Sequence, residues 1–301
     1  MLRPVIAVVG PTATGKSALA LALAEALGDA EVVNADSMQL YRGMDVGTAK
    51  LTVAQRRGIP HHQLDVLEPS QEASVAAYQR HARADVEAIR SAGRWAIVVG
   101  GSGLYLRALL EELDLPGRDP QVRAEIEARL ARTGPTALHA ALATLDPAAA
   151  GAIDPRNTRR VVRALEVVTV TGRPFAASLP SGDPHWPDVR LGLRAEWPVL
   201  DRRIVTRARR MMADGLLYEA AALGPLSRTA ARATGYAQAL AHLAGLRTHD
   251  ETVEDIALAT RQLARRQVKW FRRDARLRWL DASDPDSLLP AVLPMLEEWQ
   301  R

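Results

Sequence analysis

One short segment restricts the possible folds of this chain more than any other. The apolar run 5–9 has the length and uniform hydrophobicity of a buried parallel strand, and the helix-forming segment 16–27 lies shortly after it. The residues between satisfy the pattern G-x-x-x-x-G-K-[ST], in which backbone N–H groups, a helix N-terminus and a lysine face an anion. This order predicts a phosphate-binding loop formed by Gly10, Pro11, Thr12, Ala13, Thr14, Gly15, Lys16 and Ser17.

Further along the chain, strand-like and helical patterns alternate. Apolar strands are expected at 31–35, 95–99 and 189–193, with a short one at 279–280, and Ser74 is placed to cap a helix that runs to about residue 91. Alternation of this kind predicts a doubly wound α/β core with a parallel sheet. Residues 117–187 show helical patterns without a convincing strand, so we expect a helical insertion there and a core formed by 1–116 and 188–301.

Composition excludes several classes of protein. The 301 residues contain no cysteine, which removes disulfides, thiolate nucleophiles and cysteine-ligated zinc. The adjacent pair His61-His62 favours loop or core roles over metal ligation, because neighbouring side chains point in different directions on most backbones. No apolar run is long enough to cross a membrane and no signal segment is evident, so we expect a cytoplasmic protein.

The charge is unevenly distributed along the chain. Residues 201–278 carry 16 Lys and Arg against 8 Asp and Glu, whereas residues 1–116 carry 11 against 13. A local basic excess indicates a polyanionic partner, although a genome rich in arginine codons would also raise the count.

The phosphate-binding loop does not by itself identify the ligand. An ATPase commonly places an acidic residue after a second apolar strand to act on Mg²⁺ and water. Here the 95–99 strand runs into Gly100-Gly101, so that residue is missing from the most obvious place. Asp36, after the second strand, is the nearest candidate and lies at the carboxyl edge of the expected sheet, where ligands of open α/β folds bind.

These residues together resemble the tRNA dimethylallyltransferase (isopentenyl-tRNA transferase) family. The match includes GPTATGKS at 10–17, DSMQLYRGMDVGTAK at 36–50, PHHQLDV at 60–66, VGGSGLYLRALL at 99–110, DPQVR at 119–123, RRVVRALEV at 159–167, GYAQAL at 235–240 and TRQLARRQVKWFRR at 260–273. It covers nearly the whole chain in the family's order, and the 36–50 block is far more specific than the phosphate-binding loop. The resemblance implies a P-loop NTPase-like fold, with the helical insertion contacting tRNA.

What the resemblance implies is transfer of a dimethylallyl group. The loop would bind the diphosphate of dimethylallyl diphosphate with Mg²⁺, for which Ser17 is the expected protein ligand. The acceptor would be N6 of the adenosine immediately 3′ of the anticodon, position 37 of tRNA. Asp36 would accept the proton from N6, with Lys16 and Ser102 as further catalytic residues. Ser102 stands where the family usually has threonine, so the hydroxyl is kept and the methyl lost.

The implied partner is the anticodon stem-loop of tRNA, whose target base must be turned out of the stack to reach a buried carboxylate. A monomer without an obligate protein partner is expected. A solvated surface role stays open for each arginine, and the basic helix at about 253–273 could support the core or touch RNA. The expected tRNA-binding residues are Asp36, Ser37, Met38, Gln39, Ser102, Arg123, Arg159, Arg160, Val161, Val162, Arg163, Arg203 and Arg207.

Three other functions use some of the same features. A small-molecule or nucleoside kinase also combines a phosphate-binding loop with an aspartate after the second strand, but needs no basic C-terminal third. An adenylate isopentenyltransferase would act on free AMP or ADP, which needs neither the insertion nor the arginine clusters. A non-enzymatic RNA-binding module would leave the phosphate-binding loop unused.

Overall fold

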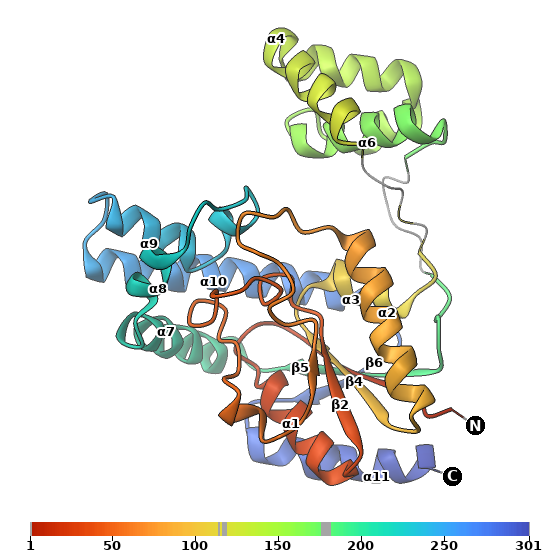
Figure 1. Cartoon of the computed structure of the whole chain (residues 1–301), viewed down its shortest axis with the longest axis vertical. Coiled ribbons are helices and arrows are strands. Elements are labelled where there is room, and N and C mark those ends of the chain that lie inside the picture. The colour runs from red at the N-terminus through yellow and green to blue at the C-terminus, as the bar shows by residue number, and fades with distance from the viewer. Residues whose placement is uncertain (1, 114, 116–118, 176–181, 301) are drawn as a thin grey trace. The chain divides into compact units, whose positions relative to one another are not determined.

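The structure is a computed structural model that describes residues 2–113, 115, 119–175 and 182–300. The chain divides into two compact units, one formed by residues 1–110 with 184–301 and the other by residues 111–183 (Figure 1). We call them the core unit and the helical unit. The expected boundary at 116–117 lies outside the described residues, and the second expected boundary, 187, lies close to the observed one.

A six-stranded parallel sheet forms the centre of the core unit. Its strand order is β3-β2-β4-β1-β5-β6. The order places the carboxyl end of β1 between those of β4 and β5, so the phosphate-binding loop emerges at the middle of the sheet. The strands are β1 (Val5–Val9), β2 (Ala30–Asn34), β3 (His61–His62), β4 (Trp95–Gly100), β5 (Asp188–Arg194) and β6 (Leu277–Asp281).

Helices cover both faces of the sheet, which confirms the doubly wound α/β fold. Alternate residues of β1 point to opposite faces, as the two-residue period of a strand requires. Ile6 and Val8 pack with helices α1 (Lys16–Leu27) and α11 (Leu288–Gln300). Val5, Ala7 and Val9 pack on the other side with α2 (Val75–Ser91) and α3 (Gly103–Leu110), and Figure 1 shows these two pairs of helices on opposite sides of the strands.

A third group of helices packs beside the carboxyl edge of the sheet. It consists of α7 (Trp197–Ala213), α8 (Leu216–Ala222), α9 (Tyr236–Leu243) and α10 (His249–Phe271), with the short helix η2 (Ala230–Arg232) packed on α9. Two further short helices, η1 (Ala54–Arg56) and η3 (Pro285–Ser287), precede β3 and α11. The core of this third group surrounds the fully buried side chains of Tyr41, Met44 and Tyr236. The segment after β2 is therefore enclosed by the C-terminal third of the chain.

The helical unit has a hydrophobic core of its own. Helices α4 (Pro120–Leu145), α5 (Pro147–Ala152) and α6 (Thr158–Thr171) contribute Leu138, Leu142, Val161 and Leu165 to it. The backbone of α4 leaves helical geometry at Gly134, directly before Pro135.

Element boundaries differ from the sequence-based expectation in a few places. The Ser74 cap is confirmed, since its side chain accepts a hydrogen bond from the Ala77 N–H. Strand β3 was not expected, because two residues are too short to show an alternating pattern. Helix α10 starts at His249, before the expected residue 253, because Thr248 and Glu251 form a capping box. None of the helices that the structure describes is long and apolar enough to cross a membrane.

Candidate active site

The phosphate-binding loop is closed by contacts to its own backbone. The carbonyl of Pro11 accepts hydrogen bonds from Thr14 Oγ1 and from Lys16 Nζ, both at 2.8 Å. Gly10 has a φ of +142°, and a Cβ there would lie 2.6 Å from the carbonyl oxygen of Leu193 on β5. Glycine is therefore required where the loop leaves β1.

Lys16 lies among charged groups that tune its ionisation. Burial lowers the pKa of Lys16 from 10.5 to about 8, while the carboxylate of Asp36 acts to raise it and the guanidinium of Arg207 acts to lower it further. The lysine is therefore a cation at neutral pH, but holds its proton less firmly than an exposed lysine.

Asp36 lies at the carboxyl edge of the sheet, two residues after the end of β2. Its N–H donates to Asn34 Oδ1 and its Oδ1 accepts from the Met38 N–H, both at 3.0 Å. These contacts fix the direction of the carboxylate through the local turn. Among the described residues, Asp36 Oδ2 has no hydrogen-bond partner, so this oxygen is available to a substrate.

Ser102 meets the same turn from the loop after β4. Its Oγ accepts from the Ser37 N–H at 3.1 Å and lies 3.2 Å from Ser37 Oγ, while its own N–H donates to the Ala35 carbonyl. The hydroxyl of Ser102 therefore contacts Ser37, the residue after Asp36, rather than the Asp36 carboxylate. Ser102 holds the Asp36 turn against β4.

The two arginines expected on one face of α7 have different partners. Arg207 donates to Thr12 Oγ1 at 3.3 Å and to the Thr48 carbonyl at 3.2 Å, so it reaches the phosphate-binding loop. Burial lowers the pKa of Arg207 and the nearby Asp36 carboxylate acts to raise it. Arg203 instead donates to the carbonyls of Ala282 and Ser283 at 2.7 and 2.9 Å. Its contacts favour a structural role over the expected tRNA contact.

Three comparisons identify the family. The sequence matches the IPP transferase family over residues 39–274. It is 57% identical over 293 residues, 95% of this chain and 92% of the relative, to the tRNA dimethylallyltransferase of Thermobifida fusca. The identity is 54% with the tRNA dimethylallyltransferase of Mycobacterium avium, over 96% of this chain and 98% of the relative. The chain belongs to the IPP transferase family.

Solved structures of IPP transferases have the same fold. The crystal structure of the tRNA isopentenylpyrophosphate transferase of Bacillus halodurans has a TM-score of 0.71 and 36% identity, covering 99% of this chain and 96% of that one. A eukaryotic dimethylallyltransferase described as acting on tRNA has a TM-score of 0.79 and 27% identity, covering 94% and 75%. The bacterial members therefore have nearly the same extent as this IPP transferase.

The helical unit of this IPP transferase carries the other expected tRNA-binding residues. Arg123 and Arg163 donate to Glu166 Oε2 at 3.3 and 2.9 Å, and this carboxylate is completely buried, so both arginines support the unit internally. Val161 and Val162 are 0% and 3% exposed, which makes them core residues and corrects their assignment as RNA contacts. Arg159 and Arg160 are exposed on α6.

Three residues at the site were not anticipated from the sequence. Gln267 of α10 contacts the phosphate-binding loop, Glu219 of α8 accepts hydrogen bonds from the backbone of residues 45–47, and Lys50 is buried between two aspartates. For Gln267 a signal existed, because a polar residue spaced three and four from Ala264 and Phe271 lies on the buried face of a helix. Glu219 had no such signal.

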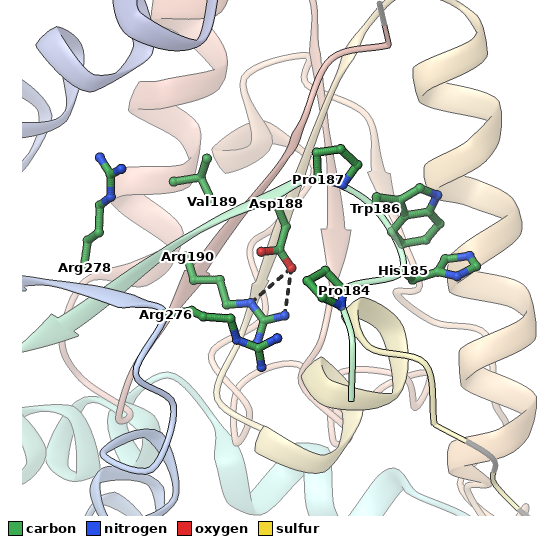
Figure 2. A pocket seen from close by; sticks show the side chains of 9 residues that line it. All are labelled: Pro184, His185, Trp186, Pro187, Asp188, Val189, Arg190, Arg276 and Arg278. Atoms are coloured by element: carbon green, nitrogen blue, oxygen red, sulfur yellow. Dashed lines mark hydrogen bonds and ion pairs between the residues drawn. The ribbon is translucent and has the colours of Figure 1, made fainter. Parts of the chain in front are cut away.

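A separate cavity of about 670 Å³ lies at the opposite edge of the sheet, where β5 and β6 begin. Figure 2 shows Arg190 in the cavity wall bonded to Asp188, and the same arginine also pairs with Asp274. Ligands of open α/β folds bind at the carboxyl ends of the strands, and this cavity is at the amino ends. We therefore assign the site to the edge that carries Lys16, Asp36 and Arg207.

Proposed function

We propose that this chain transfers the dimethylallyl group from dimethylallyl diphosphate to N6 of the adenosine at position 37 of tRNA, and releases diphosphate. One observation carries the proposal. A carboxylate with an available oxygen, that of Asp36, lies in the electrostatic field of the two cations Lys16 and Arg207 beside the phosphate-binding loop. Membership of the IPP transferase family supports the same chemistry.

On the donor side, the bond between the allylic carbon and the diphosphate oxygen breaks, and negative charge develops on the leaving group. Lys16 and Arg207 stabilise that charge, and the loop amides and the N-terminus of α1 add to the effect. Both side chains are held in place before the substrate arrives, Lys16 on the Pro11 carbonyl and Arg207 on Thr12 and Thr48. Little reorganisation is then needed as the bond breaks.

The residues of the loop fit Mg²⁺ as the cofactor. Ser17 is partly exposed at the start of α1, and among the described residues its hydroxyl has no hydrogen-bond partner. Mg²⁺ in phosphate sites is often bound by one or two protein groups together with phosphate oxygens, which one serine beside a diphosphate satisfies. When bound, the ion would further neutralise the leaving group.

On the acceptor side, N6 of the adenine attacks the allylic carbon and a carbon–nitrogen bond forms. Asp36 accepts the proton that N6 loses, through the oxygen that has no partner in the structure. The Met38 N–H and the Ser37–Ser102 contacts keep this carboxylate in place. Proton transfer to Asp36 thus serves the acceptor, and charge neutralisation by Lys16 serves the leaving group.

The adenine must leave the stacked anticodon loop to reach Asp36. Ser37, Met38 and Gln39 follow the catalytic carboxylate and are partly exposed, so they are placed to contact the extruded base. The exposed Arg159 and Arg160 of the helical unit are suited to phosphate contacts with the anticodon stem-loop. Because the substrate is tRNA, we place the activity in the cytoplasm.

The proposal is tested with labelled dimethylallyl diphosphate, Mg²⁺ and either tRNA or AMP. We expect label in tRNA, at the nucleotide 3′ of the anticodon, and none in AMP. Label in AMP alone would identify an adenylate isopentenyltransferase instead, and hydrolysis of ATP without alkyl transfer would identify a kinase or ATPase.

The role of Asp36 is tested with Asp36→Asn. Loss of a positioned general base should lower kcat by about 10²–10⁴. Binding of inorganic pyrophosphate should persist, because the asparagine keeps the shape of the side chain. Asp250→Asn is the matched control, since that side chain is 97% exposed at the start of α10. Turnover of Asp36→Asn near that of the control would exclude Asp36 as the base.

A further inference from the structure

Gln267 of α10 joins two loops that carry different parts of the proposed chemistry. Its Oε1 accepts a hydrogen bond from the Thr12 N–H of the phosphate-binding loop at 2.8 Å. Its Nε2 donates to the carbonyl of Gly101, directly before Ser102, at 3.0 Å. The residue is only 9% exposed, so both contacts are largely protected from water.

The fit around this amide is close on both sides. A Cβ at position 101 would lie 2.4 Å from Gln267 Nε2, so only glycine lets the loop after β4 approach the amide at this distance. A glutamine side chain supplies one acceptor and one donor on the same planar group. Thr12 requires the acceptor and Gly101 requires the donor, which fixes the orientation of the amide.

The two loops have distinct roles in the proposed reaction. The loop after β1 carries Lys16 and would bind the leaving diphosphate, whereas Ser102 holds the turn that carries Asp36 and would serve the acceptor. Transfer requires the allylic carbon and the adenine N6 in line at close range, and a misplacement of about 1 Å can lower the rate about 10²-fold. The distance between the loop after β1 and the loop after β4 must therefore be held constant for efficient transfer.

We propose that Gln267 is a positioning residue that fixes the phosphate-binding loop relative to the 101–102 loop, and so aligns the allylic donor with the acceptor amine. The inference rests on the proposed function. Within the basic helix α10, the residue that acts at the site is the buried amide of Gln267 and not one of the exposed charged side chains. Gln267 acts through Thr12 and Gly101 and has no part in bond breaking itself.

The test uses the whole chain and two substitutions at this position. Gln267→Met has a similar length and removes both hydrogen bonds. Gln267→Glu keeps an acceptor for Thr12 but turns a carboxylate oxygen toward the Gly101 carbonyl. Gln262→Met is the matched control, because Gln262 is exposed on the same helix. We measure kcat, the KM values for dimethylallyl diphosphate and tRNA, the Kd of inorganic pyrophosphate and the thermal midpoint.

We expect Gln267→Met to lower kcat by at least about tenfold, with the KM for tRNA close to that of the control. Pyrophosphate should bind more weakly to Gln267→Glu than to Gln267→Met, because the introduced charge lies beside the anion site. A purely structural role would lower the thermal midpoint and leave the kcat of the folded fraction unchanged, and that result would overturn the proposal.

The readouts separate this inference from the proposed function. If wild-type protein transfers no label to tRNA, the proposed function fails, while pyrophosphate affinity still reports on the loop. In that case, equal pyrophosphate affinities for Gln267→Glu, Gln267→Met and the control would overturn the inference as well. If Gln267→Met does not fold, Gln267→Glu and Gly101→Ala provide the same comparison, and wild-type kcat in both would count against alignment by Gln267.

Discussion

Two cations and one carboxylate determine the electrostatics of the site at the scale of single residues. Lys16 and Arg207 both interact with Asp36, and burial lowers the pKa of each cation. A bound diphosphate would act in the other direction, since an anion favours the protonated forms. Affinity for the anion and protonation of Lys16 should therefore depend on each other.

The first prediction concerns pH. With a pKa of about 8 in the free protein, Lys16 is charged below that value and loses its proton above it. The contribution of Lys16 to pyrophosphate affinity should be nearly constant below pH 8 and should fall at higher pH, because binding then requires proton uptake by the lysine. Isothermal titration calorimetry at several pH values, in buffers of different ionisation enthalpy, measures both effects.

Lys16→Met supplies the control for this titration. It should bind pyrophosphate more weakly at pH 7 and should lack the extra proton uptake above pH 8, while titration of pyrophosphate itself remains.

The same pKa shift of Lys16 has a consequence for folding. An unfolded lysine keeps its proton up to about pH 10.5, so the Lys16 contribution destabilises the fold below pH 8 and this cost is relieved as pH rises from 8 to 10.5. Identical pH profiles of pyrophosphate affinity and of stability in the wild type and Lys16→Met would contradict a shifted pKa at Lys16.

The second prediction compares two arginines of α7 that differ in their partners. Arg207→Ala should weaken pyrophosphate binding by about 10–100-fold, the equivalent of about 1.5–3 kcal/mol for hydrogen bonds to a charged group. Arg203→Ala removes contacts to Ala282 and Ser283 and should lower the free energy of unfolding by a similar amount, with pyrophosphate affinity unchanged. Calorimetry and urea unfolding of both variants test the contrast. Equal loss of affinity in both would contradict it.

At the scale of elements, the segment 44–50 is held from two sides. Glu219 of α8 accepts from the N–H groups of Asp45, Val46 and Gly47 at 2.8–3.2 Å, and from the hydroxyl of Tyr236. Burial and the Glu219 carboxylate both raise the pKa of Tyr236, so the tyrosine stays a donor. At the other end, Lys50 Nζ contacts Asp45 and Asp65 at 2.6 Å each.

This segment contacts residues of the site through one backbone carbonyl. Thr48 O accepts hydrogen bonds from both Arg207 and Gln39, one a cation beside the phosphate-binding loop and the other an expected tRNA contact. The anchoring of residues 45–47 by Glu219 therefore bears on both substrates.

The third prediction concerns this anchor. Glu219→Gln replaces a carboxylate that accepts four hydrogen bonds by an amide with one oxygen, and should lower the free energy of unfolding by about 1–3 kcal/mol. The KM values for tRNA and for dimethylallyl diphosphate should both rise, because Gln39 and Arg207 share Thr48. Tyr236→Phe removes only the hydroxyl and should have a smaller effect on both. Unfolding in urea and steady-state kinetics decide this, and unchanged KM values in Glu219→Gln would refute the link.

How much of the fold and the site could be predicted from the sequence depends on how far apart in sequence the interacting residues lie. The strand, loop and helix at 5–27 could be predicted because their pattern is local, and so could Asp36 as a residue at the end of a strand. The burial of Gln267 could have been inferred from its spacing on the helix, but the contacts of Gln267 and Glu219 could not, since each acts on a backbone segment more than 150 residues away in sequence. Val161 and Val162 were misassigned because they sit between arginines, whereas burial is set by the three-dimensional packing of α4 and α6.

At the scale of the whole molecule, each unit has its own hydrophobic core, and the chain leaves and re-enters the core unit at neighbouring points. The His185 N–H donates to the Leu110 carbonyl at 2.9 Å, so the two ends of the core unit are adjacent. A segment inserted between adjacent points can be removed with little change to the surrounding backbone. The residues assigned to diphosphate and to proton transfer all lie in the core unit.

The fourth prediction follows from the location of these residues in the core unit. Replacement of residues 111–183 by a short Gly/Ser linker should leave a folded core unit that binds pyrophosphate with nearly wild-type affinity, because Lys16, Arg207 and Gln267 are retained. Its KM for tRNA should rise by at least about tenfold, since even one lost charge-assisted contact is worth about 1.5–3 kcal/mol. Circular dichroism verifies folding before the kinetics are measured. A shortened protein that alkylates tRNA with wild-type KM would show that the helical unit is not needed for tRNA binding, and one that folds but fails to bind pyrophosphate would show that the diphosphate site extends beyond the core unit.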